Sequence, residues 1–253
     1  MATLLRRGLQ RLGSTSHPIR ALHESQVVSQ TELVTKPLTT SNDLDIKDPL
    51  KFPDYFGVRK LFTLKQLFAA RVHMGHKVGT LHPGMKPFLF GTRLDHCIFD
   101  LNQTVEQLLA ALNFTAHIAY RGGVIIFISH YPQHTLLVEK TAKEAGEYAH
   151  AREWKLNIFT NSENWYGAVT RLPDLCIFFS TLNSLNEEHV GIKDAAKMCI
   201  PSVAITDSNS NPNLVTFPVP GNDDSPVAIQ LYCNLFKEAI LLGKKERLKT
   251  MGS

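Results

Sequence analysis

The chain has 253 residues, of which 43% are hydrophobic and 20% are charged, a composition typical of one globular domain with appended segments. Its longer apolar runs, at residues 124–129 and 175–179, fall far short of the roughly 20 residues that cross a bilayer, so the sequence excludes a membrane-spanning protein. The formal net charge of +4 comes entirely from residues 1–23, and the rest of the chain is formally neutral, so bulk charge indicates no partner for the folded part.

Residues 1–25 have the features of a mitochondrial targeting presequence. No acidic residue precedes Glu24, leucines recur at helical spacing, and the segment contains Arg6, Arg7, Arg11 and Arg20. A disordered basic arm on a cytosolic protein is the alternative. We expect import into the mitochondrial matrix, with the presequence removed between residues 20 and 35. Residues 26–57 are polar and interrupted by prolines, and we expect them to form an extension outside the folded domain.

The folded domain is expected at residues 58–243, where helical and strand-like periodicities alternate. In chain order, the pattern predicts a helix at 63–72, a strand at 96–101, a helix at 104–120, a strand at 122–129, a helix at 133–149, strands at 156–160 and 174–180, a helix at 187–199, strands at 202–206 and 214–220, and a helix at 225–243. Thr104 and Gln107 have the spacing of a capping box at the start of the second helix. Residues 244–253 are expected to form a charged tail.

This alternation predicts a three-layer α/β domain with a mostly parallel, five-stranded sheet. Ligands of such sheets bind at the carboxyl ends of the strands, where His130 and Asp207 are the candidate acid–base pair of an enzyme. However, no predicted strand is followed by the glycine-rich turn that a phosphate group needs, and the sequence lacks the G-x-G-x-x-G, Walker and G-x-S-x-G motifs. A surface histidine and a turn-capping aspartate explain the same two positions, so we expect no catalysis, no cofactor and no small-molecule substrate.

The segment 71–91 concentrates histidine and glycine, and its first interpretation is a zinc site. His73 and His76, spaced i and i+3, would bind the ion together with His82 or Cys97. Against this, no carboxylate lies close in sequence, a lysine adjoins the histidines, and no second cluster completes four ligands. We therefore expect no metal site. The four cysteines are far apart in apolar surroundings and are expected to be buried, reduced thiols.

A polyanion is the interpretation that the charges around this segment favour. Residues 56–94 contain no acidic residue but many cationic ones, in a chain that is otherwise neutral outside its N-terminus. Such a stretch is typical of a surface that contacts phosphates, although a solvated basic loop is the alternative. The residues predicted to bind RNA are Arg71, His73, His76, Lys77, His82, Lys86 and Arg93. Of these, the histidines would act as neutral hydrogen-bond donors.

Several ordered motifs resemble the small-subunit ribosomal protein S2 family. The sequence "VHMGHKVGTLHPGMKPFLFG" is similar to its V-H-x-G-H pattern followed by P-x-M-K-P and F-G, and matches at Val72, His73, Gly75, His76, Pro83, Met85, Lys86, Pro87, Phe90 and Gly91. Later segments that resemble the family are "LNQTVEQL", "LPDLCIFF", "IPSVAITDSNSNP" and "PVPGNDDSPVAIQLY". The resemblance runs from about Leu64 to Leu242.

The resemblance implies a flavodoxin-like domain without catalytic activity, bound to small-subunit ribosomal RNA and neighbouring ribosomal proteins. With the presequence, it implies a place in the mitochondrial ribosome. Asp207 and the segment 220–224 then become turn and helix-capping residues. Two departures stand out. Basic residues that bacterial members carry in the first motif are replaced here by Gly79, Thr80 and Gly84. The long helical hairpin that bacterial members insert before L-P-D is expected to be absent, because only residues 162–171 are available for it.

Overall fold

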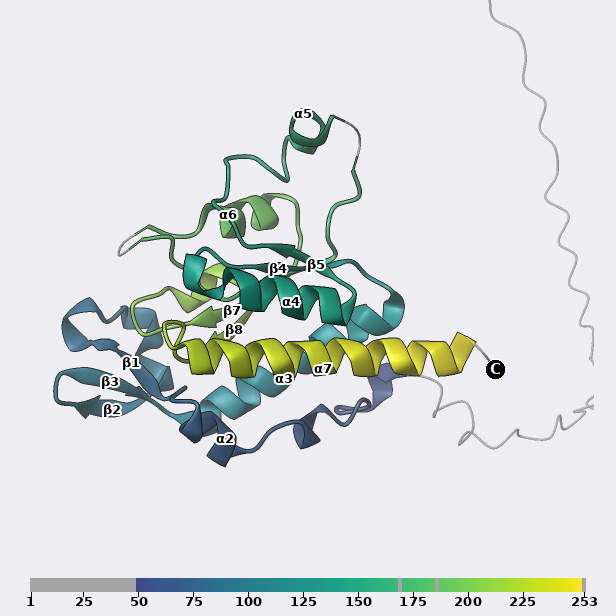
Figure 1. The fold of residues 1–253 in the computed structure, drawn as a ribbon. Coiled ribbons are helices and arrows are strands. Elements are labelled where there is room, and N and C mark those ends of the chain that lie inside the picture. Colours follow the sequence, from purple (N-terminus) through teal and green to yellow (C-terminus); the bar gives the residue numbers. More distant parts are fainter. Residues whose placement is uncertain (1–48, 168–169, 185–186, 252–253) are drawn as a thin grey trace, which may run out of the picture. The chain divides into compact units, whose positions relative to one another are not determined.

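The computed structural model describes residues 49–167, 170–184 and 187–251 (Figure 1). The predicted presequence at 1–25 and most of the predicted extension at 26–57 lie outside the described residues. No helix in the described part is both long and apolar enough to span a membrane.

The central element is a five-stranded, fully parallel sheet. Its strands are β4 (Ile125–Ile128), β5 (Tyr148–His150), β6 (Leu175–Phe178), β7 (Ser202–Thr206) and β8 (Phe217–Pro220). They pair in the order β5-β4-β6-β7-β8. Here β5, the second strand of this sheet along the chain, lies at the edge beside the first, β4, and the other three follow on the far side of β4 in chain order. This is the flavodoxin-like order. The predicted fold class is confirmed.

Helices cover the two faces of this sheet unequally (Figure 1). α3 (Leu101–Arg121), α4 (Thr135–Ala145) and α7 (Pro226–Met251) pack on one face, where their apolar side chains meet Phe127 and Ile177 in the larger core cluster. The opposite face is covered by α6 (Val190–Lys197) and by residues 151–161, which bury Trp154 against Phe178 and the rest of a smaller cluster. Because successive strand residues point to opposite faces, each buried strand contributes to both clusters.

A second, antiparallel sheet lies N-terminal to the large one in sequence. It consists of β1 (Met74–Lys77), β2 (Leu89–Arg93) and β3 (His96–Phe99), with β3 in the middle, and the short helix α2 (Leu64–Ala69) precedes it. The strand predicted at 96–101 is therefore confirmed as β3. Its partners β1 and β2 were not predicted, because glycine, proline and histidine interrupt any period-two alternation there. Short 3-10 helices span Pro49–Lys51, Val58–Lys60, Val78–Thr80, Pro83–Phe88, Pro132–His134 and Pro212–Leu214.

Two predictions around α4 and β5 were wrong. The helix predicted at 133–149 ends at Ala145, because Gly146 adopts the left-handed conformation (φ 67°) that terminates helices, and β5 follows at once. The strand predicted at 156–160 is a series of turns. Its apolar residues, Ile158 and Phe159, belong to the smaller core cluster, so their burial rather than a strand explains the hydrophobic run.

The ends of α3 and α7 also differ from prediction. Asp100 caps α3 by accepting a hydrogen bond from the Asn102 N–H (3.0 Å), so the predicted capping residue Thr104 lies inside the helix, with its hydroxyl bonded to the Asp100 carbonyl. α7 continues beyond residue 243, so the segment predicted as a charged tail is helical through Met251. Lys244 forms an ion pair with the buried Glu147 (2.6 Å), which ties this extension to the domain.

The described residues between β5 and β6 contain one short helix, α5 (Ser162–Tyr166). A long helical hairpin is absent from this part of the structure, as predicted.

Candidate nucleic-acid interface

Ser208, in the loop after β7, holds the small sheet against the large one. The His76 N–H donates to Ser208 Oγ (2.9 Å), and the His82 N–H donates to the Ser208 carbonyl (2.9 Å). One loop residue thereby satisfies backbone donors on β1 and on the segment that follows it. The Asp-Ser-Asn sequence after β7 therefore builds the junction between the two sheets.

Asn222, in the turn between β8 and α7, makes the second connection. Its side-chain Nδ2 donates to the Arg71 carbonyl (3.2 Å), and its backbone N–H donates to the Val72 carbonyl (3.1 Å). Its Oδ1 accepts from the N–H groups of Asp224 (2.9 Å) and Ser225 (3.3 Å), immediately before α7 begins. Both N–H groups precede α7, whose first turn is closed by the bond from the Ile229 N–H to the Ser225 carbonyl, so Asn222 has the predicted turn role but does not cap the helix itself. Its bond to Arg71 adds a docking role.

Two of the predicted RNA-binding histidines have structural partners. The His73 ring stacks on Phe68, with ring centroids 4.4 Å apart, and burial lowers the pKa of His73. His82 precedes the 3-10 helix at Pro83–Phe88, and its Nδ1 accepts a hydrogen bond from the Gly84 N–H (3.1 Å). Both side chains thus help to shape the segment that carries the predicted interface.

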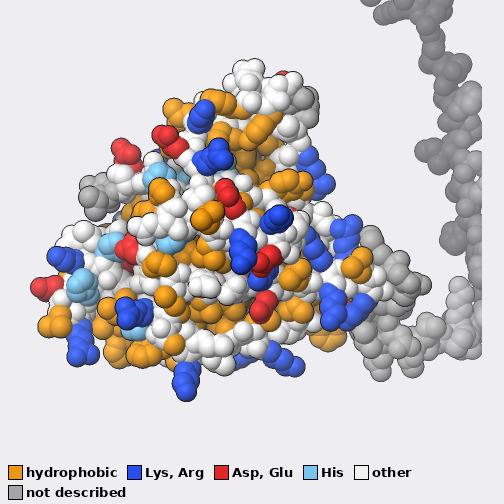
Figure 2. Space-filling model, in the orientation of Figure 1, with side chains coloured by type: hydrophobic (Ala, Val, Ile, Leu, Met, Phe, Trp, Pro, Cys, Tyr) orange, Lys and Arg blue, Asp and Glu red, His pale blue; other side chains and the backbone are white. Residues whose placement is uncertain are grey.

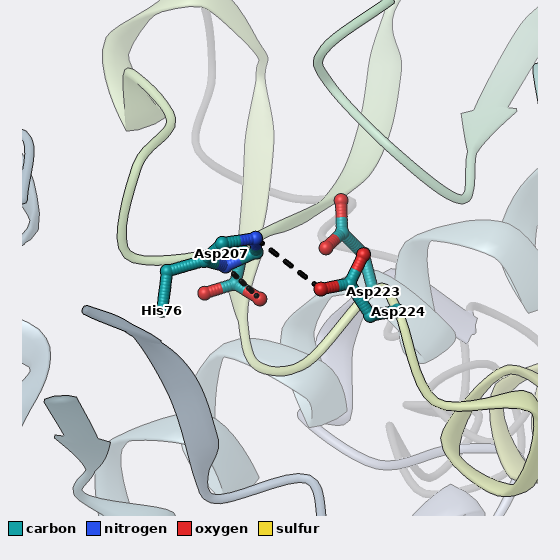
Figure 3. A group of neighbouring side chains, drawn as sticks. All are labelled: His76, Asp207, Asp223 and Asp224. Atoms are coloured by element: carbon teal, nitrogen blue, oxygen red, sulfur yellow. Dashed lines mark ion pairs between the residues drawn. The ribbon is translucent and has the colours of Figure 1, made fainter. Parts of the chain in front are cut away.

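The third histidine, His76, lies among three aspartates (Figure 3). Its Nδ1 is 3.1 Å from Oδ2 of Asp207, and its Nε2 is 3.2 Å from Oδ2 of Asp224. The contact with Asp207 raises the pKa of His76 to about 9, the charges of Asp207, Asp224 and Asp223 add to the rise, and burial opposes it. Burial, with the nearby charge of Asp207, raises the pKa of Asp223 well above its ordinary value.

The four predicted fixed cations are all exposed. Arg71 precedes β1, Lys77 ends it, Lys86 lies in the 3-10 helix before β2, and Arg93 ends β2. Exposed apolar side chains are interspersed among them, notably Met74 (43%), Phe90 (80%) and Leu94 (86%). Figure 2 accordingly shows separate basic groups over the small sheet, with hydrophobic and acidic groups between them. Such a surface can make several separate contacts with phosphates, but it does not form one continuous basic groove.

The residues of the alternative enzyme site are not brought together. Asp207 lies against His76, and no ion pair joins it to His130 within the described residues. The His130 ring instead neighbours His189, with centroids 6.5 Å apart. At the strand ends where a flavodoxin-like protein binds its ligand, Ser129 and Ser180 are buried (2% and 3% exposed).

The sequence interpretation missed the association of His76 with Asp207, Asp223 and Asp224. These residues come from β1, from the loop after β7 and from the turn before α7, so no local spacing relates them. The two aspartate-containing turns were recognised in the sequence as turn and capping segments. What a single sequence does not show is that both turns face the same histidine.

Comparison with known proteins gives consistent matches. The family model of ribosomal protein S2 matches residues 67–178 and 164–243. The small ribosomal subunit protein uS2m of Bos taurus is 52% identical over 202 residues, covering 80% of this chain and 69% of the bovine protein. The small ribosomal subunit proteins uS2 of Rickettsia massiliae and Rickettsia felis are 31% and 30% identical over 233 residues, covering 75% of this chain and 78% of each relative.

Proposed function

The chain belongs to the ribosomal protein S2 family and is a structural, non-enzymatic protein of the mitochondrial small ribosomal subunit, and we propose that it binds small-subunit ribosomal RNA through its small antiparallel sheet. In this role it supports mitochondrial translation by holding RNA and neighbouring ribosomal proteins in place. The presequence at residues 1–25, which lies outside the described structure, would direct it to the matrix.

The exposure of Arg71, Lys77, Lys86 and Arg93 is the observation that carries this proposal. All four extend to solvent from a segment without acidic residues between positions 56 and 94. Lysine and arginine contacts to phosphate position a protein on RNA without reading base sequence. We assign the phosphate contacts to these four cations.

The three histidines receive a different role in the proposal. His73 stacks on Phe68, His76 forms ion pairs with aspartates, and His82 accepts a backbone hydrogen bond. Their side chains therefore hold the segment that carries the cations in place. We assign contacts with a neighbouring ribosomal protein to the apolar residues Phe90 and Leu94, because exposed aromatic and aliphatic side chains gain most from burial against another protein.

The test reverses charge at two exposed positions of the small sheet. The double variant Lys77→Glu, Lys86→Glu is expressed in cells that lack the endogenous protein, and mitochondrial extract is sedimented through a density gradient at two salt concentrations. We expect most of the variant to leave the small-subunit fractions. The difference in affinity from the unmodified chain should be larger at the lower salt concentration, because each phosphate contact that is removed lowers the salt slope by about one.

The matched control is Lys140→Glu, Lys143→Glu, which makes the same charge change on the exposed surface of α4. This variant should sediment with the small subunit as the unmodified chain does. If the small-sheet variant also remained in the small subunit at both salt concentrations, the RNA-binding face would lie elsewhere on the protein.

A further inference from the structure

We propose that His76, Asp223 and Asp224 bind a divalent transition-metal ion while Asp207 orients the His76 ring, with Zn²⁺ as the best chemical match. Each residue offers one ligand atom, and these four atoms all lie within 4.8 Å of one another (Figure 3). The proposal does not depend on RNA binding. It assigns a ligand to a cluster that joins the small sheet to the α/β body.

The distances suit ligands that share one ion. Zinc binds imidazole nitrogen and carboxylate oxygen at about 2.0–2.2 Å, so two ligand atoms on the same ion lie roughly 3–4 Å apart. Nε2 of His76 already lies 3.2 Å from Oδ2 of Asp224, which is the spacing of two ligands on one ion, whereas Asp207 lies 3.1 Å from the other ring nitrogen, Nδ1. A small inward movement of the Asp223 carboxylate completes the set.

A second, independent observation is the unmet bonding capacity of a buried carboxylate, that of Asp207. The Asp207 side chain is 1% exposed, and although His76 lies nearby, Oδ2 of Asp207 accepts no aligned hydrogen bond. Asp223 is 5% exposed. Within the described residues, no lysine or arginine forms an ion pair with any of the three aspartates, which leaves His76 as their cation. Burying carboxylates without full compensation is costly, and a divalent ion provides the missing charge.

The position of the imidazole fits this assignment. Both ring nitrogens of His76 face carboxylates. A metal-bound histidine commonly donates its other N–H to a carboxylate, which orients the ring and fixes its tautomer. One nitrogen can therefore bind the ion while the other keeps its aspartate partner.

The ligand types select the class of metal. Mg²⁺ and Ca²⁺ prefer sites made of oxygen, whereas an imidazole in the set favours a transition ion such as Zn²⁺. The site is also accessible, because it borders an open cleft of about 500 Å³ lined by Arg71, Lys77 and Asp224, among others. Asp224 is 56% exposed and marks the solvent side of the cluster.

The ion would link distant chain segments. The ligand His76 lies on β1 and the ligands Asp223 and Asp224 precede α7, while Asp207, which orients His76, follows β7. A shared metal would thus fasten the small sheet at the same junction where Ser208 and Asn222 make their hydrogen bonds. Its expected effect is to slow amide exchange in β1 and to raise the thermal midpoint of the free protein.

The experiment uses the purified full-length chain and Zn²⁺ alone. Competition with a chelating dye at pH 7.5 measures stoichiometry and affinity, and thermal unfolding is followed with and without the ion. We expect one equivalent of Zn²⁺ and a raised thermal midpoint. Asp224→Asn, which alters an exposed side chain and should fold, is expected to weaken binding at least tenfold, because it removes one ligand.

Asp95→Asn is the matched control, since it makes the same charge change at an exposed turn between β2 and β3 and should bind within twofold of the unmodified chain. Zinc X-ray absorption should show imidazole and oxygen neighbours. Three results would each overturn the proposal: equal affinity in Asp224→Asn, a sulfur neighbour that implicates the adjacent Cys97, or an equal rise of the thermal midpoint with Mg²⁺ at the same concentration.

Discussion

Replacing Asn222 with alanine should loosen the junction between the two sheets. The change removes the bond from Nδ2 to the Arg71 carbonyl and the two bonds that Oδ1 accepts from Asp224 and Ser225. Loss of the hydrogen bonds that hold the turn before α7 costs about 1 kcal/mol, and loss of the bond to Arg71 at a nearly buried site costs about the same. We therefore expect the free energy of unfolding to fall by about 2 kcal/mol, which corresponds to a decrease of roughly 4–8 °C in the thermal midpoint for a domain of this size.

The serine variant separates the two roles of this side chain. Asn222→Ser keeps an oxygen that can accept hydrogen bonds in the turn before α7 but has no donor that reaches Arg71, so it should lose about half as much stability. Urea unfolding with a chelator present measures both variants, and hydrogen exchange reports on β1, whose His76 N–H is bonded to Ser208. The reasoning is refuted if Asn222→Ala costs less than about 0.5 kcal/mol, the usual limit for an inert surface change, or if exchange in β1 does not accelerate.

Two further predictions concern buried groups. Gly221→Ala should cost about 2 kcal/mol, because the added Cβ would overlap the Tyr232 hydroxyl. Tyr232→Phe should restore much of that loss, since this hydroxyl has no hydrogen-bond partner among the residues that the structure describes. Urea unfolding of the two single variants and the double variant checks this, and a double variant no more stable than Gly221→Ala would contradict it. Burial, aided by the charges of His130 and His150, lowers the pKa of His189 from 6.5 to about 4. Because the unfolded chain then takes up the proton first, the stability that neutral His189 provides is complete above pH 6.5 and is lost as the pH falls towards 4, by about 2 kcal/mol at pH 5. His189→Asn keeps an acceptor for the Gly191 N–H and should flatten that pH dependence in thermal unfolding; an unchanged slope would show that other groups cause it.

The parallel sheet and its helices could be predicted from the sequence because their signals are local. The run at residues 122–129 and the run at 174–180 are continuous and β-branched or aromatic, and they became β4 and β6. Where a local signal was ambiguous, the prediction failed. The apolar residues Ile158 and Phe159 suggested a strand, but they lie in a turn and pack into the smaller core cluster. The short edge strand β5 was missed because its sequence has no distinctive pattern.

The cations of the proposed RNA-binding face could also be located in advance, because the absence of acidic residues between positions 56 and 94 is a property of the sequence itself. All four of Arg71, Lys77, Lys86 and Arg93 are exposed, as a phosphate-binding role requires. The partners of the histidines could not be located in this way. His76 and Ser208 are 132 positions apart, and Asn222 and Arg71 are 151 positions apart.

The sequence by itself thus determined the α/β class, the strand and helix alternation and the charge of one segment, because each depends on neighbours along the chain. Only the tertiary structure decided that the histidine-rich segment forms a sheet and that His76 faces three aspartates. A zinc site was set aside from the sequence because no carboxylate lies near the histidines along the chain. Folding brings three carboxylates to His76. The parallel strands β7 and β8 end at the same edge of the sheet, beside β1, and the three aspartates lie in the turns that follow them.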